Sequence, residues 1–147
     1  MYIVDEQKNT VVVDFDGVIA EYDHWRGADV FGKPVPYGEF ALQEFMSWGW
    51  RVVIYTTREV TTALLSYFKD NHIVYHGIND CRHNPPGCSN KPIATVYLDD
   101  RSWNDVGRRW CWKRVMRRMR KLYQPRPKTS EIDNAADWDL RGRRDDR

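Results

Sequence analysis

Short apolar runs alternate with longer amphipathic stretches along the first hundred residues, and this alternation limits the folds that the chain can adopt. Two of the stretches, 37–48 and 60–71, repeat their apolar residues every three or four positions, as helices do. Strands that alternate with helices form βαβ units and a parallel sheet. We therefore expect an α/β fold of Rossmann-like type, with three layers and helices on both faces of the sheet. The runs rich in β-branched residues that read as strands are 10–15, 51–56, 73–75 and 94–98.

Polar residues lie at the carboxyl ends of three of the expected strands. Asp14 and Asp16 lie at the carboxyl end of the first strand, and side chains two positions apart along a strand point the same way. Two converging carboxylates repel each other unless a cation or a shared proton relieves them. Thr56 ends the second strand, and Asp99-Asp100 follows the fourth. Because ligands of open parallel sheets bind beyond the carboxyl ends of the strands, we expect one site there, with a metal, acid–base chemistry or both.

Size and composition predict one globular domain in a reducing compartment. The chain has 147 residues, a mean hydropathy of −0.72 and an acidic, polar N-terminus, so we expect no membrane span, no signal peptide and a cytoplasmic location. The cysteines Cys81, Cys88 and Cys111 are an odd number without a regular framework. A zinc site from Cys81, Cys88, His83 and His76 is conceivable, but the spacing is poor and the segment is a Pro/Gly loop.

The polar strand ends, taken together, resemble the haloacid dehalogenase superfamily of phosphotransferases. The similarity extends over residues 10–106. The closest cues, Ile-Tyr-Thr-Thr-Arg at 54–58 and Leu-Asp-Asp-Arg at 98–101, are similar to the 3′-phosphatase part of phage-type polynucleotide kinase, although no GxxxxGK[ST] kinase motif occurs. The four motifs of the family appear in order as Asp14-Phe15-Asp16-Gly17-Val18, Thr56, Lys91-Pro92 and Asp99-Asp100.

The resemblance implies a catalytic role for each motif. Asp14 would be the nucleophile that forms an aspartyl-phosphate, and Asp16 would be the general acid and then the general base. Thr56 would donate a hydrogen bond to a phosphoryl oxygen, with the Thr57 backbone N–H as a second donor. Lys91 would offset the negative charge of nucleophile and phosphate. Without the resemblance, Thr56 reads as a strand terminator and Lys91 as a solvated loop lysine.

The resemblance also implies a Mg²⁺ cofactor. Asp14 and Asp99 would bind the ion together with the backbone carbonyl of Asp16, while Asp100 would hold a metal-bound water or orient the motif lysine. Hard oxygen ligands with retained waters suit Mg²⁺. Asp99-Asp100 could also cap a short helix over 101–106.

The spacing of the motifs leaves no room for a cap domain, because the gaps at 19–36 and 59–90 are short. We therefore expect an open site. The resemblance to family members without a cap implies a phosphomonoester on a macromolecule as substrate, or a lid from a neighbouring subunit in a homo-oligomer. Arg58 would pair with an acid or touch the substrate. The aromatic and cationic residues after the first motif would stack on a nucleobase or pack the loop onto the core; they are Tyr22, His24, Trp25 and Arg26.

The positive charge is concentrated near the C-terminal end. Residues 101–126 hold 10 basic and 1 acidic side chains, whereas residues 1–100 hold 8 basic and 14 acidic ones. The range 111–123 predicts an amphipathic helix with an apolar side for docking. Its basic side would bind the phosphates of a nucleic acid, with a membrane surface or a merely solvated face as alternatives. The candidate polyanion-binding residues are Lys113, Arg114, Arg117, Arg118, Arg120 and Lys121.

The sequence thus predicts three parts: a catalytic domain over 1–109, a basic helix over 110–124 and a loose charged tail over 125–147. The favoured function is a Mg²⁺-dependent phosphatase for the phosphate of a nucleotide or a nucleic-acid end. Two alternatives stay open. One is a phosphatase for a small sugar or metabolite phosphate, and the other is a nucleic-acid-binding or regulatory protein with little turnover.

Overall fold

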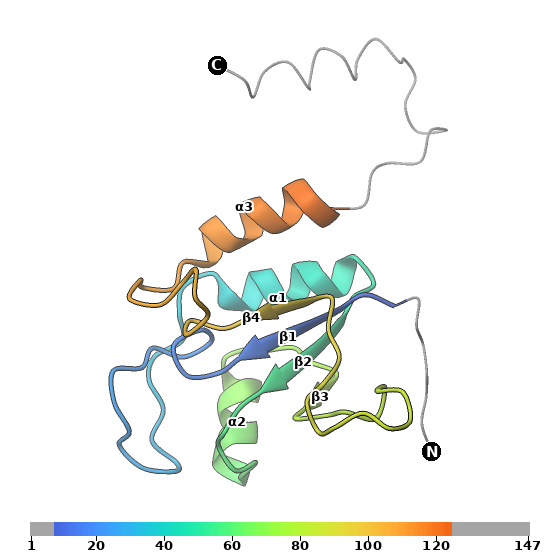
Figure 1. The fold of residues 1–147 in the computed structure, drawn as a ribbon. Helices are drawn as coiled ribbons and strands as arrows, with labels where there is room; N and C mark the ends of the chain where they lie inside the picture. Colours follow the sequence, from blue (N-terminus) through green and yellow to red (C-terminus); the bar gives the residue numbers. More distant parts are fainter. Residues whose placement is uncertain (1–7, 125–147) are drawn as a thin grey trace, which may run out of the picture.

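The computed structural model describes residues 8–124, and it forms four strands and three helices (Figure 1). The charged tail predicted at 125–147 lies outside the described residues. No helix in the described part is long and apolar enough to cross a membrane. In chain order the elements are β1 (Thr10–Asp14), α1 (Gly38–Ser47), β2 (Arg51–Tyr55), α2 (Thr62–Asp70), β3 (Gly77–Ile78), β4 (Val96–Leu98) and α3 (Trp112–Tyr123).

The strands form one parallel sheet in the order β3-β2-β1-β4, which confirms the predicted α/β fold of Rossmann-like type. The register places Asp14 opposite Tyr55 and Val13 opposite Leu98. The residues that follow β1, β2 and β4 therefore meet at one edge of the sheet. This edge is where the sequence predicts the site.

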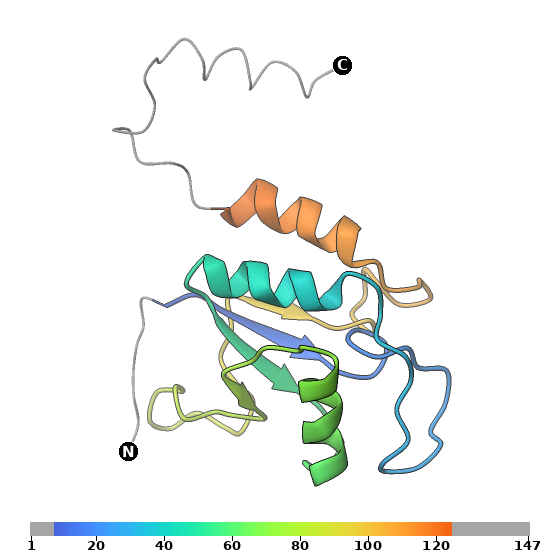
Figure 2. The same ribbon diagram turned by 180° about the vertical axis from the view of Figure 1, so that it is seen from behind.

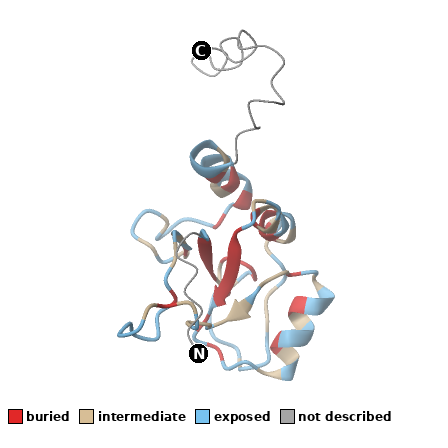
Figure 3. Cartoon of the chain, turned by 90° about the vertical axis from the view of Figure 1, so that its right-hand side faces the viewer, coloured by how far each residue is buried: buried red, intermediate tan, exposed pale blue. Residues whose placement is uncertain are grey.

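One face of the sheet carries the hydrophobic core. Val11, Val13 and Ile54 are fully buried and belong to one cluster with the buried residues of all three helices. Figure 3 shows the buried strands beside the helices, and Figure 2 shows α1 and α2 on the same side of the sheet. The valines suit this place because β-branched side chains pack well on a pleated surface.

The second face of the sheet has no helix among the described residues, so the expectation of helices on both faces is wrong for this face. Residues 79–95 connect β3 to β4 without helical structure, because their prolines and glycine interrupt any helix. The connection lies against Tyr97, whose hydroxyl donates to the Pro92 carbonyl at 2.7 Å. Tyr97 pairs with Val12, which is buried on the same face.

Two further local expectations need correction. The apolar residues 73–75 are not a strand, because β3 consists of Gly77–Ile78. Ile73 instead packs into the core, and the Tyr75 ring lies 5.2 Å from Phe68. The range 101–106 forms turns and no helix.

The loop over 17–36 closes on itself beside the end of β1 and makes no cap domain. The Glu21 N–H donates to the Lys33 carbonyl and the Val35 N–H donates to the Ile19 carbonyl, both at 2.8 Å. A Cβ at Gly32 would lie 1.8 Å from the Glu21 carbonyl oxygen. Only glycine permits this close approach of the two arms.

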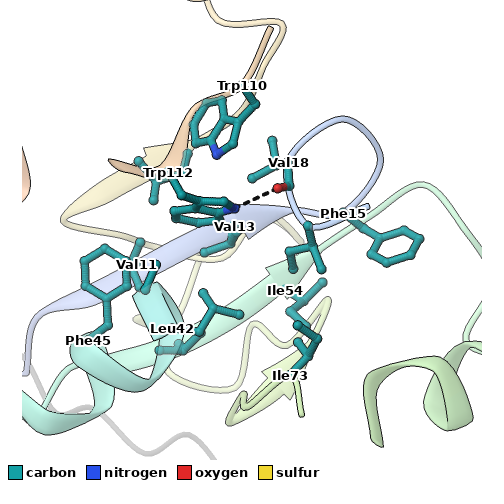
Figure 4. Close-up of a cluster of buried hydrophobic side chains, with 14 of the residues drawn as sticks. Val11, Val13, Phe15, Val18, Leu42, Phe45, Ile54, Ile73, Trp110 and Trp112 are labelled. Carbon is teal, nitrogen blue, oxygen red and sulfur yellow. Dashed lines mark hydrogen bonds between the residues drawn. The ribbon is translucent and has the colours of Figure 1, made fainter. Parts of the chain in front are cut away.

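The predicted basic helix exists as α3, and its apolar side belongs to the core of the sheet. Trp112 is 1% exposed, and its indole N–H donates to the Val18 carbonyl at 2.9 Å (Figure 4). Met116 and Met119 are buried in the same cluster. Leu122, near the end of the helix, is 58% exposed. The helix is thereby packed against the same body that carries the strand-end acids.

Candidate active site

Three aspartates converge where β1 and β4 end. Carboxylate oxygens of Asp14, Asp99 and Asp100 lie within 4.8 Å of one another. The resemblance implies that Asp14 and Asp99 bind the metal and that Asp100 holds a metal-bound water or orients the motif lysine. The carboxylate of Asp16 is not in this cluster, and its expected contribution through the backbone carbonyl stays a prediction.

The cluster has a strong preference for added positive charge. The pKa of Asp14 is raised from 3.8 to about 7, because the carboxyl group is buried and because Asp99 and Asp100 repel its charged form. Burial likewise raises the pKa of Asp100, and the charge of Asp99 adds to that effect. A shared proton or a cation therefore stabilises this arrangement.

A divalent cation with hard oxygen ligands fits the donor set. All three ligand candidates are carboxylates, and Asp100 Oδ1 is buried without a hydrogen-bond partner. A buried acceptor without a hydrogen-bond donor lowers the stability of the fold, unless a cation or a donor binds to it. Mg²⁺ commonly uses one or two carboxylates and keeps several waters, which this half-exposed cluster permits.

Gly17 is required by the cluster itself. Its φ is +85°, and a Cβ there would lie 2.2 Å from Asp100 Oδ2. A side chain at this position would displace the carboxylate. The glycine of the first motif thus marks the turn that brings β1 and the residues after β4 together.

Asp16 points to a different partner. Arg58 donates to its carboxylate through Nε at 2.7 Å and Nη2 at 3.0 Å, and Arg58 is only 5% exposed. The same guanidinium donates to the carbonyls of Gly27, Ala28 and Val30 at 3.2, 2.9 and 3.1 Å. Of the two alternatives left open for Arg58, the structure shows the pairing with an acid. This one side chain holds both the acid and the loop over 17–36.

Aromatic rings surround the Arg58 guanidinium. Its carbon lies 4.7 Å from the Trp25 ring centroid and 5.1 Å from that of Phe31. Trp25 is 56% exposed, so the ring both packs on Arg58 and presents a face to solvent. Arg26 pairs with Asp23 at 2.8 Å on the loop surface.

The remaining residues predicted in this loop make no contact with Arg58 that resembles the one of Trp25. His24 accepts a hydrogen bond from the Arg26 side chain at 3.3 Å and is exposed. Tyr22 lines a cleft together with Gly17 and Asp100. The structure therefore brings Trp25 to the Asp16–Arg58 pair, and it places Tyr22 in the cleft that Asp100 of the aspartate cluster also lines.

The end of β2 is fixed by a residue that sequence reasoning missed. Asn79 accepts from the Thr56 N–H at 2.8 Å and donates to the Thr56 carbonyl at 3.0 Å. The Thr56 hydroxyl accepts from the Arg58 N–H at 3.1 Å, which leaves its own proton for another acceptor. Thr57, beside it, is exposed at the same strand end. Nothing in the local sequence distinguishes Asn79 from an ordinary turn asparagine.

Lys91 lies on the sheet face opposite the helices. Its ammonium is 4.5 Å from the centroid of the Tyr97 ring. Tyr97 pairs with Val12, two residues before Asp14, so the lysine and the Asp14 side chain share one face. The structure brings Lys91 to the correct side of the sheet and shows it bound to an aromatic ring.

Two of the six cations predicted to bind a polyanion are held within the chain. Arg120 pairs with Glu44 of α1 at 2.6 Å and donates to the Tyr37 hydroxyl at 3.1 Å. Arg114 pairs with Asp105 at 3.3 Å. The other four are exposed on α3; they are Lys113, Arg117, Arg118 and Lys121.

Comparison with known proteins adds a structural likeness. No family model matches the chain, and no curated protein does. A solved structure described as that of a conserved protein from Bacteroides thetaiotaomicron is 24% identical, covers 78% of this chain and 91% of its own, and has a TM-score of 0.59. A D,D-heptose 1,7-bisphosphate phosphatase from B. bronchiseptica, solved with magnesium and phosphate, is 22% identical. It covers 56% of this chain and 55% of its own, with a TM-score of 0.38. The chain therefore shares its α/β fold with the conserved Bacteroides protein.

Proposed function

We propose that this chain is a Mg²⁺-dependent phosphomonoester hydrolase of the haloacid dehalogenase type, with the phosphate of a nucleotide or of a nucleic-acid end as its favoured substrate. The observation that carries the proposal is the different surroundings of two carboxylates near one strand end. Asp14 belongs to the aspartate cluster, whereas Asp16 is paired with Arg58. Two acids with separate partners suit two separate catalytic roles.

The chemistry divides between these two acids. An Asp14 oxygen attacks phosphorus, and the bond from phosphorus to the leaving oxygen breaks as protonated Asp16, released from its ion pair with Arg58, gives that oxygen a proton. Asp16 then takes a proton from water, and the water oxygen displaces the Asp14 carboxylate from phosphorus. The products are the alcohol and inorganic phosphate, and both acids return to their starting states.

The surrounding residues bind and orient the phosphoryl group. Thr56 offers its hydroxyl proton to a phosphoryl oxygen, and Lys91 reaches the same group from its place on the Asp14 side of the sheet. Asp14, Asp99 and Asp100 would hold Mg²⁺, which when bound offsets the negative charge of carboxylates and phosphate. Arg58 holds the ionised form of Asp16, the form that takes the proton from water, through two hydrogen bonds.

Two features favour a nucleotide or nucleic-acid end over a small metabolite. The loop over 17–36 forms no cap, so a large leaving group can approach the strand ends. Trp25 presents an exposed ring beside the Asp16–Arg58 pair, and such rings stack on bases.

A phosphatase screen tests the proposal. The purified chain is assayed with Mg²⁺ and with EDTA on 3′- and 5′-phosphorylated oligonucleotides, mononucleotides and sugar phosphates. We expect Mg²⁺-dependent release of phosphate, with the nucleotide class preferred. Asp14→Asn should abolish it, and Asp16→Asn should lower it by about 10²- to 10⁴-fold, the usual contribution of a general acid.

Asp70→Asn is the matched control, because Asp70 is an exposed aspartate at the end of α2. It should retain full turnover. Turnover that persists in Asp14→Asn would exclude the proposed nucleophile. A preference for sugar phosphates would retain the chemistry and exclude the favoured substrate.

A further inference from the structure

A cleft of about 990 Å³ runs from the aspartate cluster along the side of the molecule. One wall comes from the loop over 17–36, and the other comes from residues 100 and 108–113. These two segments lie at the same end of the molecule in Figures 1 and 2. Gly17 and Asp100 line the cleft where it meets the candidate active site, so a molecule bound at the aspartates extends into it.

The walls of the cleft carry more cations than carboxylates. Arg26 and Arg109 are already engaged in exposed ion pairs with carboxylates of the loop, at 2.8 and 3.0 Å. The other three lining cations have no ion pair within the described residues, and these are Lys33, Arg108 and Lys113. The cleft therefore attracts a ligand with several negative charges.

Both of the buried side-chain atoms without a hydrogen-bond partner in the described part belong to residues that line this cleft. They are Asp100 Oδ1 and the indole nitrogen of Trp110. Trp110 is only 7% exposed, and its neighbour Trp112 shows how such a group is normally satisfied, by a bond to the Val18 carbonyl. Buried polar groups are rarely left unpaired. A ligand oxygen or ring nitrogen that accepts the Trp110 N–H would remove this cost.

The positive charge continues from the cleft onto α3. Lys113 lines the cleft and lies in the first turn of the helix. Arg117 and Lys121 follow at intervals of four residues and are exposed, so all three lie on one side of the helix, about 6 Å apart along its axis. We call Lys113, Arg117 and Lys121 the α3 stripe.

We propose that the cleft and the α3 stripe together bind single-stranded nucleic acid, with its terminal phosphate at the aspartates. This inference rests on the proposed function, since the strand end must be the substrate. Successive backbone phosphates lie against the cleft lysines and then the stripe, and the Trp110 N–H donates to the strand inside the cleft. Cations along a groove combined with aromatic groups are the usual means of binding a single strand.

Binding is measured by fluorescence anisotropy with a labelled, 3′-phosphorylated oligo(dT) in EDTA, over a series of salt concentrations. We expect log K to fall linearly with log[salt]. Lys113→Gln and Arg117→Gln should each weaken binding and lower the slope by about 0.7, the value for one phosphate contact on a single strand. Trp110→Phe removes a neutral donor, so affinity should fall by roughly 2- to 10-fold without a change in slope.

Lys69→Gln is the matched control, because Lys69 is an exposed lysine in the last turn of α2. It should bind like the unmodified chain. The inference is wrong if Lys113→Gln and Arg117→Gln behave like this control, or if a duplex with the same end binds as tightly as the single strand.

The two proposals fail in different ways. Mg²⁺-dependent release of phosphate without salt-dependent binding of the single strand would exclude the strand path and leave the hydrolase in place. Strand binding with the expected loss in the stripe variants, but without release of phosphate, would support the path and exclude the hydrolase.

Discussion

Replacing Asp14 by asparagine should stabilise the metal-free protein, and the gain should grow with pH. In the folded chain the pKa of Asp14 is about 7, against an ordinary value of 3.8. Between these two values the folded state binds more protons than the unfolded state, so stability is lost as the pH rises through the window. Below pH 4 the group is protonated in both states and the stabilising contribution is fully present.

The size of the effect follows from the pKa difference. A pKa difference of about 3 corresponds to roughly 4 kcal/mol of unfolding free energy, because each pKa unit is worth about 1.36 kcal/mol. This is an upper bound because Asp14, Asp99 and Asp100 titrate together. The substituted asparagine would carry no charge, and its side-chain oxygen could still accept the Phe15 N–H, which bonds to Asp14 at 2.8 Å. Asp14→Asn should therefore match the unmodified chain at pH 4 and exceed it at pH 8 by up to about 4 kcal/mol. For a chain of this size that is roughly 8 to 16 °C in Tm.

Thermal unfolding in EDTA at pH 4, 6 and 8 measures the difference, with Asp70→Asn as the surface control. Saturating Mg²⁺ at pH 8 should stabilise the unmodified chain and reduce the Tm difference between it and Asp14→Asn, because the ion binds only when the proton leaves the cluster. A Tm difference that stays constant from pH 4 to pH 8, or favours the unmodified chain at pH 8, would refute the reasoning from buried like charges.

Substitutions at three further positions test separate parts of the structure. Arg58→Met leaves Asp16 without its buried partner and should destabilise the chain by about 3 to 5 kcal/mol in urea unfolding; an unchanged midpoint would show that the pair is dispensable. Trp112→Ala removes a buried ring and should cost about 3 to 5 kcal/mol, and Trp112→Phe should cost less in the same assay because it loses mainly the N–H bond. Gly17→Ala places a methyl group against the Asp100 carboxylate, so calorimetry should detect no Mg²⁺ binding where the unmodified chain binds it.

Most of the sheet and the position of the site could be predicted because their signals are local. Val11–Val13 and Val52–Ile54 form strands through their own side chains, and the polar residues follow them directly in sequence. The third strand could not be predicted in this way. Residues 73–75 are the more apolar segment, but Gly77–Ile78 pair with β2, and apolar character alone does not distinguish packing from strand pairing.

The contacts that organise the site are long-range and have no local signature. Arg58 and Asp16 are 42 residues apart, and Arg120 and Glu44 are 76 residues apart. The charge pattern on α3 predicts a basic side, yet it does not indicate that Arg120 turns to α1. Such pairings depend on how the helices approach each other in space, which the alternation of residues along one helix does not encode.

The docking of α3 has a consequence for how the chain acquires its fold during synthesis. β1 is synthesised early but lies inside the sheet, and β4, its second neighbour, is the last strand of the described residues to be made. Trp112 then bonds to Val18, 94 residues earlier. A growing chain therefore exposes one edge of β1 and much of its core until about residue 119 has left the ribosome. Folding of the described part is completed by α3, so protection by a chaperone would matter most just before this helix emerges.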